Sequence, residues 1–313
     1  MGKVWSIQYL RALAALGVVL YHLGERAGHP IKIGAAGVDL FFVISGFIMW
    51  MISEGETPIS FGLSRLWRIV PMYWAVTLLL FAKHVMEHQS PGVWRLVFSM
   101  FFVPHVNEQG EYFPILVPGW TLNFEMFFYL VFGLCLLIAD RRRQMLALSV
   151  ALVLSIGVAA LMRLPLQYPL LAEFLAGVWL CEFWRRGWLT RGPILVVAGV
   201  ALFALGRLAP FSEALRPILW GVPAFLVVAG SLAMEPKLPK WPWLKALGDS
   251  SYSLYLTHGL VIGVLWSRIG WWGGLAAVVV SLGLFYGVER PLHRIFDFSN
   301  AGRLRRARAS QNQ

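Results

Sequence analysis

The chain has 313 residues, of which 58% are hydrophobic and 14% are charged. Soluble domains carry about 25% charged residues, so this composition excludes both an ordinary soluble domain and a disordered chain. In a soluble protein the net charge of +11 would indicate a nucleic-acid partner. In a membrane protein it is typical of basic loops that face anionic lipid, and we expect no nucleic acid. The composition therefore predicts an all-α polytopic membrane protein.

Continuous apolar runs along the chain predict about ten transmembrane helices. Their ranges are 7–23, 37–53, 70–87, 119–139, 145–162, 168–184, 193–209, 216–234, 250–268 and 271–288. The stretch 93–103 is apolar but too short to span, and we expect it at the membrane interface or re-entering the membrane. We expect one transmembrane domain over 1–298, followed by a basic cytoplasmic tail over 299–313.

The distribution of basic residues predicts the orientation of these helices. With ten spans, nineteen of the 27 Lys and Arg fall on the side that holds both termini, and the remaining eight fall on the other side. Both termini are therefore expected in the cytoplasm. The segment 88–118 is then the longest extracytoplasmic loop, and a loop of that length is often functional.

Ionisable residues inside the predicted spans are the first candidates for a functional site, because a charge in hydrocarbon costs about 2.5–3.5 kcal/mol. In the first span, Arg11 and His22 are eleven residues apart, about 16 Å along one face of a helix. Taken singly, Arg11 fits a residue that snorkels to lipid phosphate, and His22 fits an interfacial residue. Together they fit the two ends of a polar path through the membrane.

Three ionisable side chains have similar predicted depth, in the outer third of the membrane: His22, Asp39 and Glu125. Asp39 is a candidate to orient the imidazole of His22, and its alternative role is to cap the second helix. Glu125 is either a second catalytic carboxylate or half of a structural ion pair, and Asn123 beside it adds hydrogen-bonding capacity. Gly46 in the second span would allow close helix packing.

Two further polar groups lie far apart in the sequence. Arg65 and Arg68 share one helical face on the cytoplasmic side, which suits a phosphate ligand but equally fits ordinary positive-inside charge. Tyr255 and His258 lie in the polar half of the ninth span, where a buried, hydrogen-bonded histidine is the common structural case.

We expect neither a metal site nor a disulfide. His84 and His88 have the i, i+4 spacing of a metal pair, but the sequence around them offers no evident third ligand. Cys135 and Cys181 both fall inside apolar runs.

Six segments in this order resemble the acyltransferase-3 family of membrane acyltransferases, over nearly the whole chain. The segments are IQYLRALAALGVVLYH, GVDLFFVISGFIMW, FGLSRLWRIVPMYW, PGWTLNFEMFFYLVF, SYSLYLTH and VERP. The Arg-X10-His pattern is met by Arg11 and His22, and the Arg-X-X-Arg pattern by Arg65 and Arg68. The chain is most similar to bacterial exopolysaccharide and O-antigen acetyltransferases.

The resemblance implies a ten-helix bundle in the bacterial inner membrane that takes part in polysaccharide biosynthesis by O-acetylation. An acyl group, usually acetyl, would pass from cytoplasmic acyl-CoA to a sugar hydroxyl of an extracytoplasmic glycan or lipid-linked oligosaccharide. Acetyl-CoA is then a co-substrate, and no cofactor is bound permanently. His22 would act as general base or carry an acyl-imidazole, and the sequence leaves these two mechanisms open.

The other implied roles divide between the two substrates. Asp39 or Glu125 would orient His22 as further catalytic residues. Donor binding is expected from Arg11, Arg65 and Arg68, and acceptor binding from Asn123, Tyr255 and His258.

Two other function classes also fit the sequence. A transporter or flippase for a lipid-linked glycan would use ten spans with intramembrane charges, and dependence on coenzyme A discriminates it from an enzyme. A non-catalytic subunit of polysaccharide assembly machinery is the third class. In that case His22→Ala would leave the acetyl content of the glycan intact.

Overall fold

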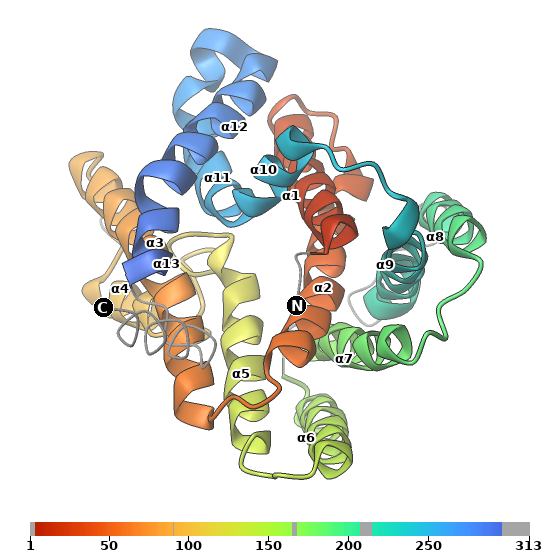
Figure 1. The fold of residues 1–313 in the computed structure, drawn as a ribbon. Helices are drawn as coiled ribbons and strands as arrows, with labels where there is room; N and C mark the ends of the chain where they lie inside the picture. Colours follow the sequence, from red (N-terminus) through yellow and green to blue (C-terminus); the bar gives the residue numbers. More distant parts are fainter. Residues whose placement is uncertain (1–3, 90, 165–167, 207–214, 296–313) are drawn as a thin grey trace, which may run out of the picture. The chain divides into compact units, whose positions relative to one another are not determined.

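The computed structural model of the chain describes residues 4–89, 91–164, 168–206 and 215–295. Over these residues the fold is all-helical and has no strand (Figure 1). The α-helices are α1 Trp5–Arg26, α2 Gly37–Ile52, α3 Pro58–Met86, α4 Val93–Met100, α5 Gly119–Cys135, α6 Arg141–Leu161, α7 Leu171–Arg185, α8 Gly192–Gly206, α9 Val222–Ala233, α10 Pro242–Asp249, α11 Ser251–Ile269, α12 Gly273–Leu284 and α13 Arg290–Ile295. The tail expected over 299–313 lies outside the described residues.

Each of the ten predicted ranges overlaps one of these helices, and the apolar stretch 93–103 contains the short helix α4. By length and apolar composition, five stretches are candidates to cross a membrane: Trp5–Arg26, Lys32–Ile52, Pro58–Met86, Arg141–Leu161 and Ser251–Ile295. Three shorter apolar helices cover Gly119–Cys135, Gly192–Gly206 and Pro217–Ala233. The chain is thus a helical membrane protein, while ten crossings and cytoplasmic termini stay predictions.

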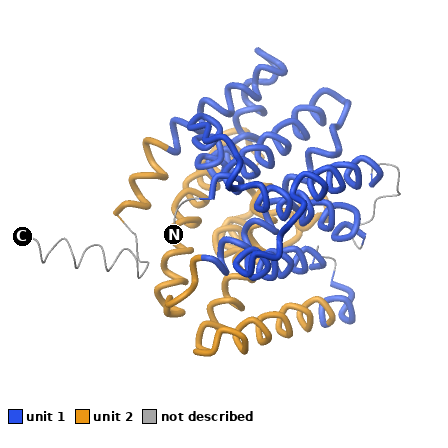
Figure 2. The backbone as a smooth tube through the Cα atoms, turned by 45° about the vertical axis from the view of Figure 1, so that its right-hand side comes forward, with its two compact units in different colours: residues 1–51, 158–285 blue, residues 52–157, 286–313 orange. Residues whose placement is uncertain are grey.

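The chain divides into two compact units (Figure 2). The first unit comprises residues 1–51 and 158–285, and the second comprises residues 52–157 and 286–313. Each unit therefore combines segments that are distant in the sequence.

The core of the first unit lies where α1, α11 and α12 meet. Its apolar residues are almost fully buried, and those on α1 are spaced i, i+4, i+8 along one helical face. They are Ala15, Val19, Leu23, Leu254, Ile262 and Ala277. This packing fixes the face that α1 turns toward α11.

Helices α2 and α7 touch backbone to backbone through two glycines. A Cβ atom on Gly46 would lie 1.9 Å from the carbonyl oxygen of Phe174, and one on Gly177 would lie 2.0 Å from that of Val43. No other residue type fits at that distance, so the close packing expected at Gly46 is confirmed.

The start of α1 is held by a carboxylate from the α9–α10 connection. Glu235 accepts hydrogen bonds from the backbone N–H groups of Trp5 and Ser6, each at 2.8 Å. These are two of the donors that an α-helix leaves unpaired at its first turn, and a negative charge there also suits the helix dipole. The hydroxyl of Tyr9 adds a bond to the carbonyl of Pro239 at 2.5 Å.

In the second unit, α3 begins twelve residues before the predicted range 70–87. Thr57 caps this helix, its hydroxyl oxygen accepting from the N–H of Ser60 at 3.2 Å, and Pro58 occupies the first helical position. Pro71 lies inside the helix rather than at its start. The basic residues of this segment are therefore helical residues of α3.

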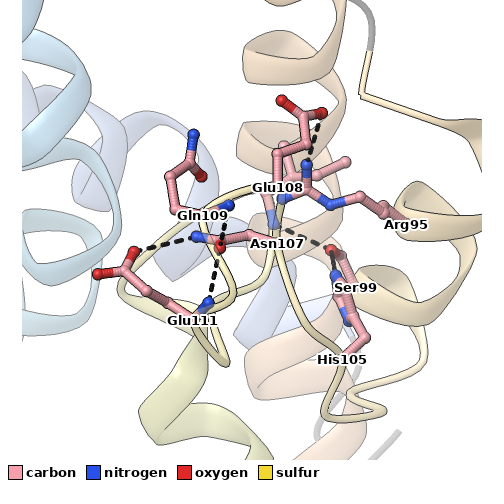
Figure 3. A network of polar contacts seen from close by, with 8 residues as sticks. Arg95, Ser99, His105, Asn107, Glu108, Gln109 and Glu111 are labelled. Atoms are coloured by element: carbon pink, nitrogen blue, oxygen red, sulfur yellow. Dashed lines mark hydrogen bonds and ion pairs between the residues drawn. The ribbon is translucent and has the colours of Figure 1, made fainter.

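The loop between α4 and α5 is held by a polar network (Figure 3). Arg95 Nη1 lies 3.2 Å from Glu108, while Ser99 Oγ lies 3.5 Å from His105 Nε2 and accepts a backbone N–H at 3.0 Å. The side-chain oxygen of Asn107 accepts two backbone N–H groups at 3.0 and 2.8 Å. This loop belongs to the segment 88–118, which we expect outside the cytoplasm, and these bonds give it an ordered conformation.

Candidate functional site

The imidazole of His22 lies near the end of α1, in the first unit. Its Nδ1 is 2.8 Å from Glu25 Oε2, and its side chain is 33% exposed. An ionised carboxylate only accepts hydrogen bonds, so Nδ1 carries the proton and Nε2 keeps its lone pair. Nε2 is therefore the atom suited to take a proton from a hydroxyl group.

Helix α11 brings His258, a predicted acceptor-binding residue, to His22, and Tyr255 lies beside His258. The ring of His258 lies 5.0 Å from that of His22, centroid to centroid, and Tyr255 lies 6.1 Å from His258. His258 is 1% exposed, and its Nδ1 bonds the carbonyl of Leu254 at 3.1 Å. Since that carbonyl is an acceptor, the Nδ1 of His258 also carries the proton.

Asp39 has a different partner from the one expected. Its carboxylate is fully buried and accepts two bonds from Arg216, from Nε at 3.0 Å and from Nη2 at 3.1 Å. The two parallel donors of a guanidinium match both oxygens of a carboxylate, which burial would otherwise leave unpaired. In the structure the carboxylate that bonds His22 is Glu25, and Asp39 forms a buried ion pair.

A second carboxyl group adjoins this ion pair. Glu173 is 2% exposed and interacts electrostatically with both Asp39 and Arg216. The guanidinium of Arg216 also lies over the ring of Trp220, 5.1 Å from its centroid. By sequence alone, Arg216 is one of the eight basic residues expected on the extracytoplasmic side. Its place just before an apolar helix, at the predicted depth of Asp39, is the signal that could have paired the two residues.

Arg11 is 9% exposed, at the other end of α1 from His22. Its Nη1 lies 3.5 Å from the side-chain oxygen of Gln8, one turn earlier. Burial along most of its length matches an arginine turned into the helical bundle more closely than one that snorkels to lipid.

In the second unit, α3 and α5 bring a basic and an acidic site residue together. The guanidinium of Arg65 lies within electrostatic range of Tyr129, Arg68 and Glu125. The hydroxyl of Tyr129 donates a hydrogen bond to Glu125. The expected donor-binding and carboxylate residues of this unit thus form one polar cluster, linked by a tyrosine that the sequence analysis did not single out.

The i, i+4 spacing of Glu125 and Tyr129 places both on one face of α5, which is the signal that could have found the tyrosine. Asn123 lies on the same helix, two residues before Glu125, and its side-chain oxygen is buried without a hydrogen-bond partner in the described structure. An unpaired buried acceptor is suited to a hydroxyl donor from a ligand.

Among the residues that the structure describes, no group of three His, Cys, Asp or Glu side chains is arranged to hold a metal ion. Cys135 and Cys181 are both buried.

The chain matches the family model described as acyltransferase domain over residues 4–289, which includes parts of both units. It is 38% identical to the exopolysaccharide production protein ExoZ of Rhizobium meliloti, over 93% of this chain and 98% of that protein. It is 25% identical to the acyltransferase MdmB of Streptomyces mycarofaciens, over 82% of this chain and 78% of that protein.

It is also 22% identical to the peptidoglycan O-acetyltransferase OatA of Listeria monocytogenes, over 82% of this chain and 49% of that protein. No solved structure matches the chain. On the extent of the family match and on the similarity to ExoZ over nearly the whole of both chains, the chain belongs to the acyltransferase-3 family.

Proposed function

We propose that the protein is an integral membrane O-acyltransferase of the bacterial inner membrane. It transfers an acetyl group from cytoplasmic acetyl-CoA to a sugar hydroxyl of an extracytoplasmic or lipid-linked polysaccharide. The observation that carries this proposal is His22, whose Nδ1 is held by a carboxylate and whose Nε2 is left as a base. The family membership supports acyl transfer, and the names of ExoZ and OatA support a glycan acceptor.

The proposed reaction is direct transfer. The sugar oxygen attacks the thioester carbonyl carbon while His22 Nε2 takes the hydroxyl proton, because a sugar hydroxyl is a weak nucleophile without a base. The tetrahedral intermediate collapses by breaking the carbon–sulfur bond. The sugar keeps the acetyl group as an ester, and coenzyme A leaves as a thiolate that accepts the proton from the imidazolium.

Three basic residues are assigned to the donor. Arg65 and Arg68 are one turn apart on α3, and two guanidiniums on one helical face suit the phosphates of coenzyme A. Arg11 is assigned to a donor phosphate or to the oxyanion that develops on the thioester carbonyl. Asn123, Tyr255 and His258 are assigned to the acceptor, which they would bind through hydrogen bonds.

The test measures ester-linked acetyl on the surface polysaccharide of the host, comparing wild type, a deletion strain, and the deletion strain carrying single variants. We expect acetyl to be lost on deletion and not restored by His22→Ala, since removing a general base costs about 10²–10⁴-fold in rate. His29→Ala is the matched control, because His29 is an exposed histidine just beyond the same helix. The control is expected to restore acetylation fully.

Three results would contradict the proposal. Full restoration by His22→Ala, at equal protein level, means that His22 is not the base. A deletion that leaves acetylation intact but stops glycan export indicates a transporter. If purified protein in lipid nanodiscs transfers no label from [14C]acetyl-CoA to the isolated polysaccharide, acetyl-CoA is not the donor.

A further inference from the structure

The last two turns of α1 contain three neighbouring side chains: Tyr21, His22 and Glu25. Glu25 is three residues after His22, so both side chains project from the same face of the helix. The Nδ1–Oε2 distance of 2.8 Å is that of a charge-assisted hydrogen bond. The base and the carboxylate that bonds it therefore come from one rigid helix, and their geometry does not depend on helix packing.

Tyr21 fixes the carboxylate in turn. Tyr21 lies one helical turn before Glu25 and interacts electrostatically with it, and the edge of its ring contacts His22 at a centroid distance of 5.0 Å. Glu25 thus accepts a hydrogen bond from the Nδ1–H group of His22 and has Tyr21 as a second neighbour on the same helix. These contacts restrict the rotation of a glutamate whose side chain is otherwise 42% exposed.

The other charged groups around the pair do not replace Glu25. Arg26 interacts electrostatically with His22, and the ring of His258 lies 5.0 Å from it, but neither side chain is a carboxylate. Asp39 is bound to Arg216. Among the described residues, Glu25 is the carboxylate hydrogen-bonded to His22.

We propose that Glu25 is the positioning residue for His22, with Tyr21 as its anchor. Glu25 holds the imidazole in the Nδ1–H tautomer, directs Nε2 at the acceptor hydroxyl, and stabilises the imidazolium that forms when the proton is taken. This inference rests on the proposed function of His22 as the base.

A merely structural pair would behave differently, because an exposed i, i+3 ion pair contributes little to folding. The first readout is therefore spectroscopic and independent of activity. In protein labelled with [15N]histidine, the His22 signals are identified by their loss in His22→Ala. We expect the Nδ1–H tautomer in the wild type and a shift toward the Nε2–H tautomer in Glu25→Leu.

The second readout is kinetic. We expect Glu25→Gln and Glu25→Leu to lower kcat by roughly 10- to 100-fold, with KM for acetyl-CoA unchanged. The loss is smaller than that for removing the general base itself, because the imidazole is still present. Glu25→Asp and Tyr21→Phe should fall between these variants and the wild type. Glu87→Gln and Glu87→Leu are the matched controls, because Glu87 is 45% exposed and ends α3 in an ion pair with Lys83.

The outcomes separate the two proposals. If His22→Ala keeps its activity, the proposed base fails whatever Glu25 does. If His22→Ala is inactive while Glu25→Leu has wild-type kcat and an unchanged tautomer, the positioning role is overturned. If Glu25→Leu does not fold, Glu25→Gln decides the question, because it has nearly the shape of the glutamate and lacks only its charge.

Discussion

At the residue scale, Tyr129 is the side chain that links the two helices of the second unit's polar cluster. It is 7% exposed, its hydroxyl donates to Glu125, and its ring meets Phe61 edge-on at 6.0 Å. We expect Tyr129→Phe to lower the free energy of unfolding by about 1.5–3 kcal/mol, the usual contribution of a hydrogen bond to a charged group. Thermal unfolding in detergent measures this loss, with Tyr112→Phe as the control.

Tyr112 is a suitable control because it is a partly exposed tyrosine of the loop that precedes α5. A double mutant with Glu125→Gln shows whether the loss comes from this bond. If Tyr129 and Glu125 interact, the effects of the two single changes do not add. Additive effects, or a Tyr129→Phe variant as stable as Tyr112→Phe, would show that the hydrogen bond contributes nothing.

The same scale shows what the sequence could predict about the site. His22, Asp39 and His258 were identifiable because an ionisable residue within an apolar run is rarely accidental. The partner of Asp39 was not, because Arg216 is 177 residues away and only helix packing brings them together. Glu25 could have been predicted as the partner of His22, since a carboxylate three residues after a histidine on a helix can bond its ring. The predicted membrane depth of the residues favoured Asp39 instead.

At the scale of the element, hydrophobic runs located the helices but not their ends. The helix α3 continues to Pro58, past two arginines that interrupt the apolar run, because a threonine cap and an N-terminal proline start it there. Pro71 falls inside α3, where membrane helices tolerate proline. Capping residues, more than hydropathy, would have predicted this start.

The glycine contact between α2 and α7 yields a prediction at the same scale. Alanine at Gly46 or Gly177 would place a methyl group about 2 Å from a carbonyl oxygen of the other helix, so the two backbones must separate. We expect each change to destabilise the protein by at least about 1–3 kcal/mol, the usual cost of overpacking. The thermal midpoint in detergent measures it.

The control for this prediction is Gly283→Ala. Gly283 also lies inside a helix, α12, yet a Cβ atom there would meet nothing within 4 Å. Alanine is favoured over glycine in a helix by up to about 1 kcal/mol, so this variant should be as stable as the wild type or slightly more so. Equal thermal midpoints for Gly46→Ala and Gly283→Ala would contradict the close contact.

At the scale of the whole molecule, the site residues divide between the two units. Arg11, His22, Asp39, Tyr255 and His258 lie in the first, and Arg65, Arg68, Asn123 and Glu125 lie in the second. The family match includes parts of both, so the two units together make up the acyltransferase domain. Composition could predict a helical membrane protein, but it could not predict this division, which depends on contacts between distant segments.

Orientation also belongs to the whole molecule, and the excess of Lys and Arg on one side predicts it. The test labels single cysteines with a membrane-impermeant maleimide in spheroplasts, after Cys135 and Cys181 have been changed to alanine. We expect Gln109→Cys, in the loop after α4, to react in intact spheroplasts. Arg143→Cys, in the first turn of α6, should react only after the membrane is permeabilised, and both side chains are exposed.

This experiment also bears on the direction of acyl transfer. The proposed donor is cytoplasmic and the proposed acceptor extracytoplasmic, so the loop after α4 must face the acceptor. If Arg143→Cys reacts in intact spheroplasts and Gln109→Cys does not, the orientation is inverted. The network around Asn107 would then face the cytoplasm, and the loop could not choose an extracytoplasmic sugar. Labelling of Gln109→Cys alone leaves that loop on the acceptor side, where its exchange can alter the acceptor used.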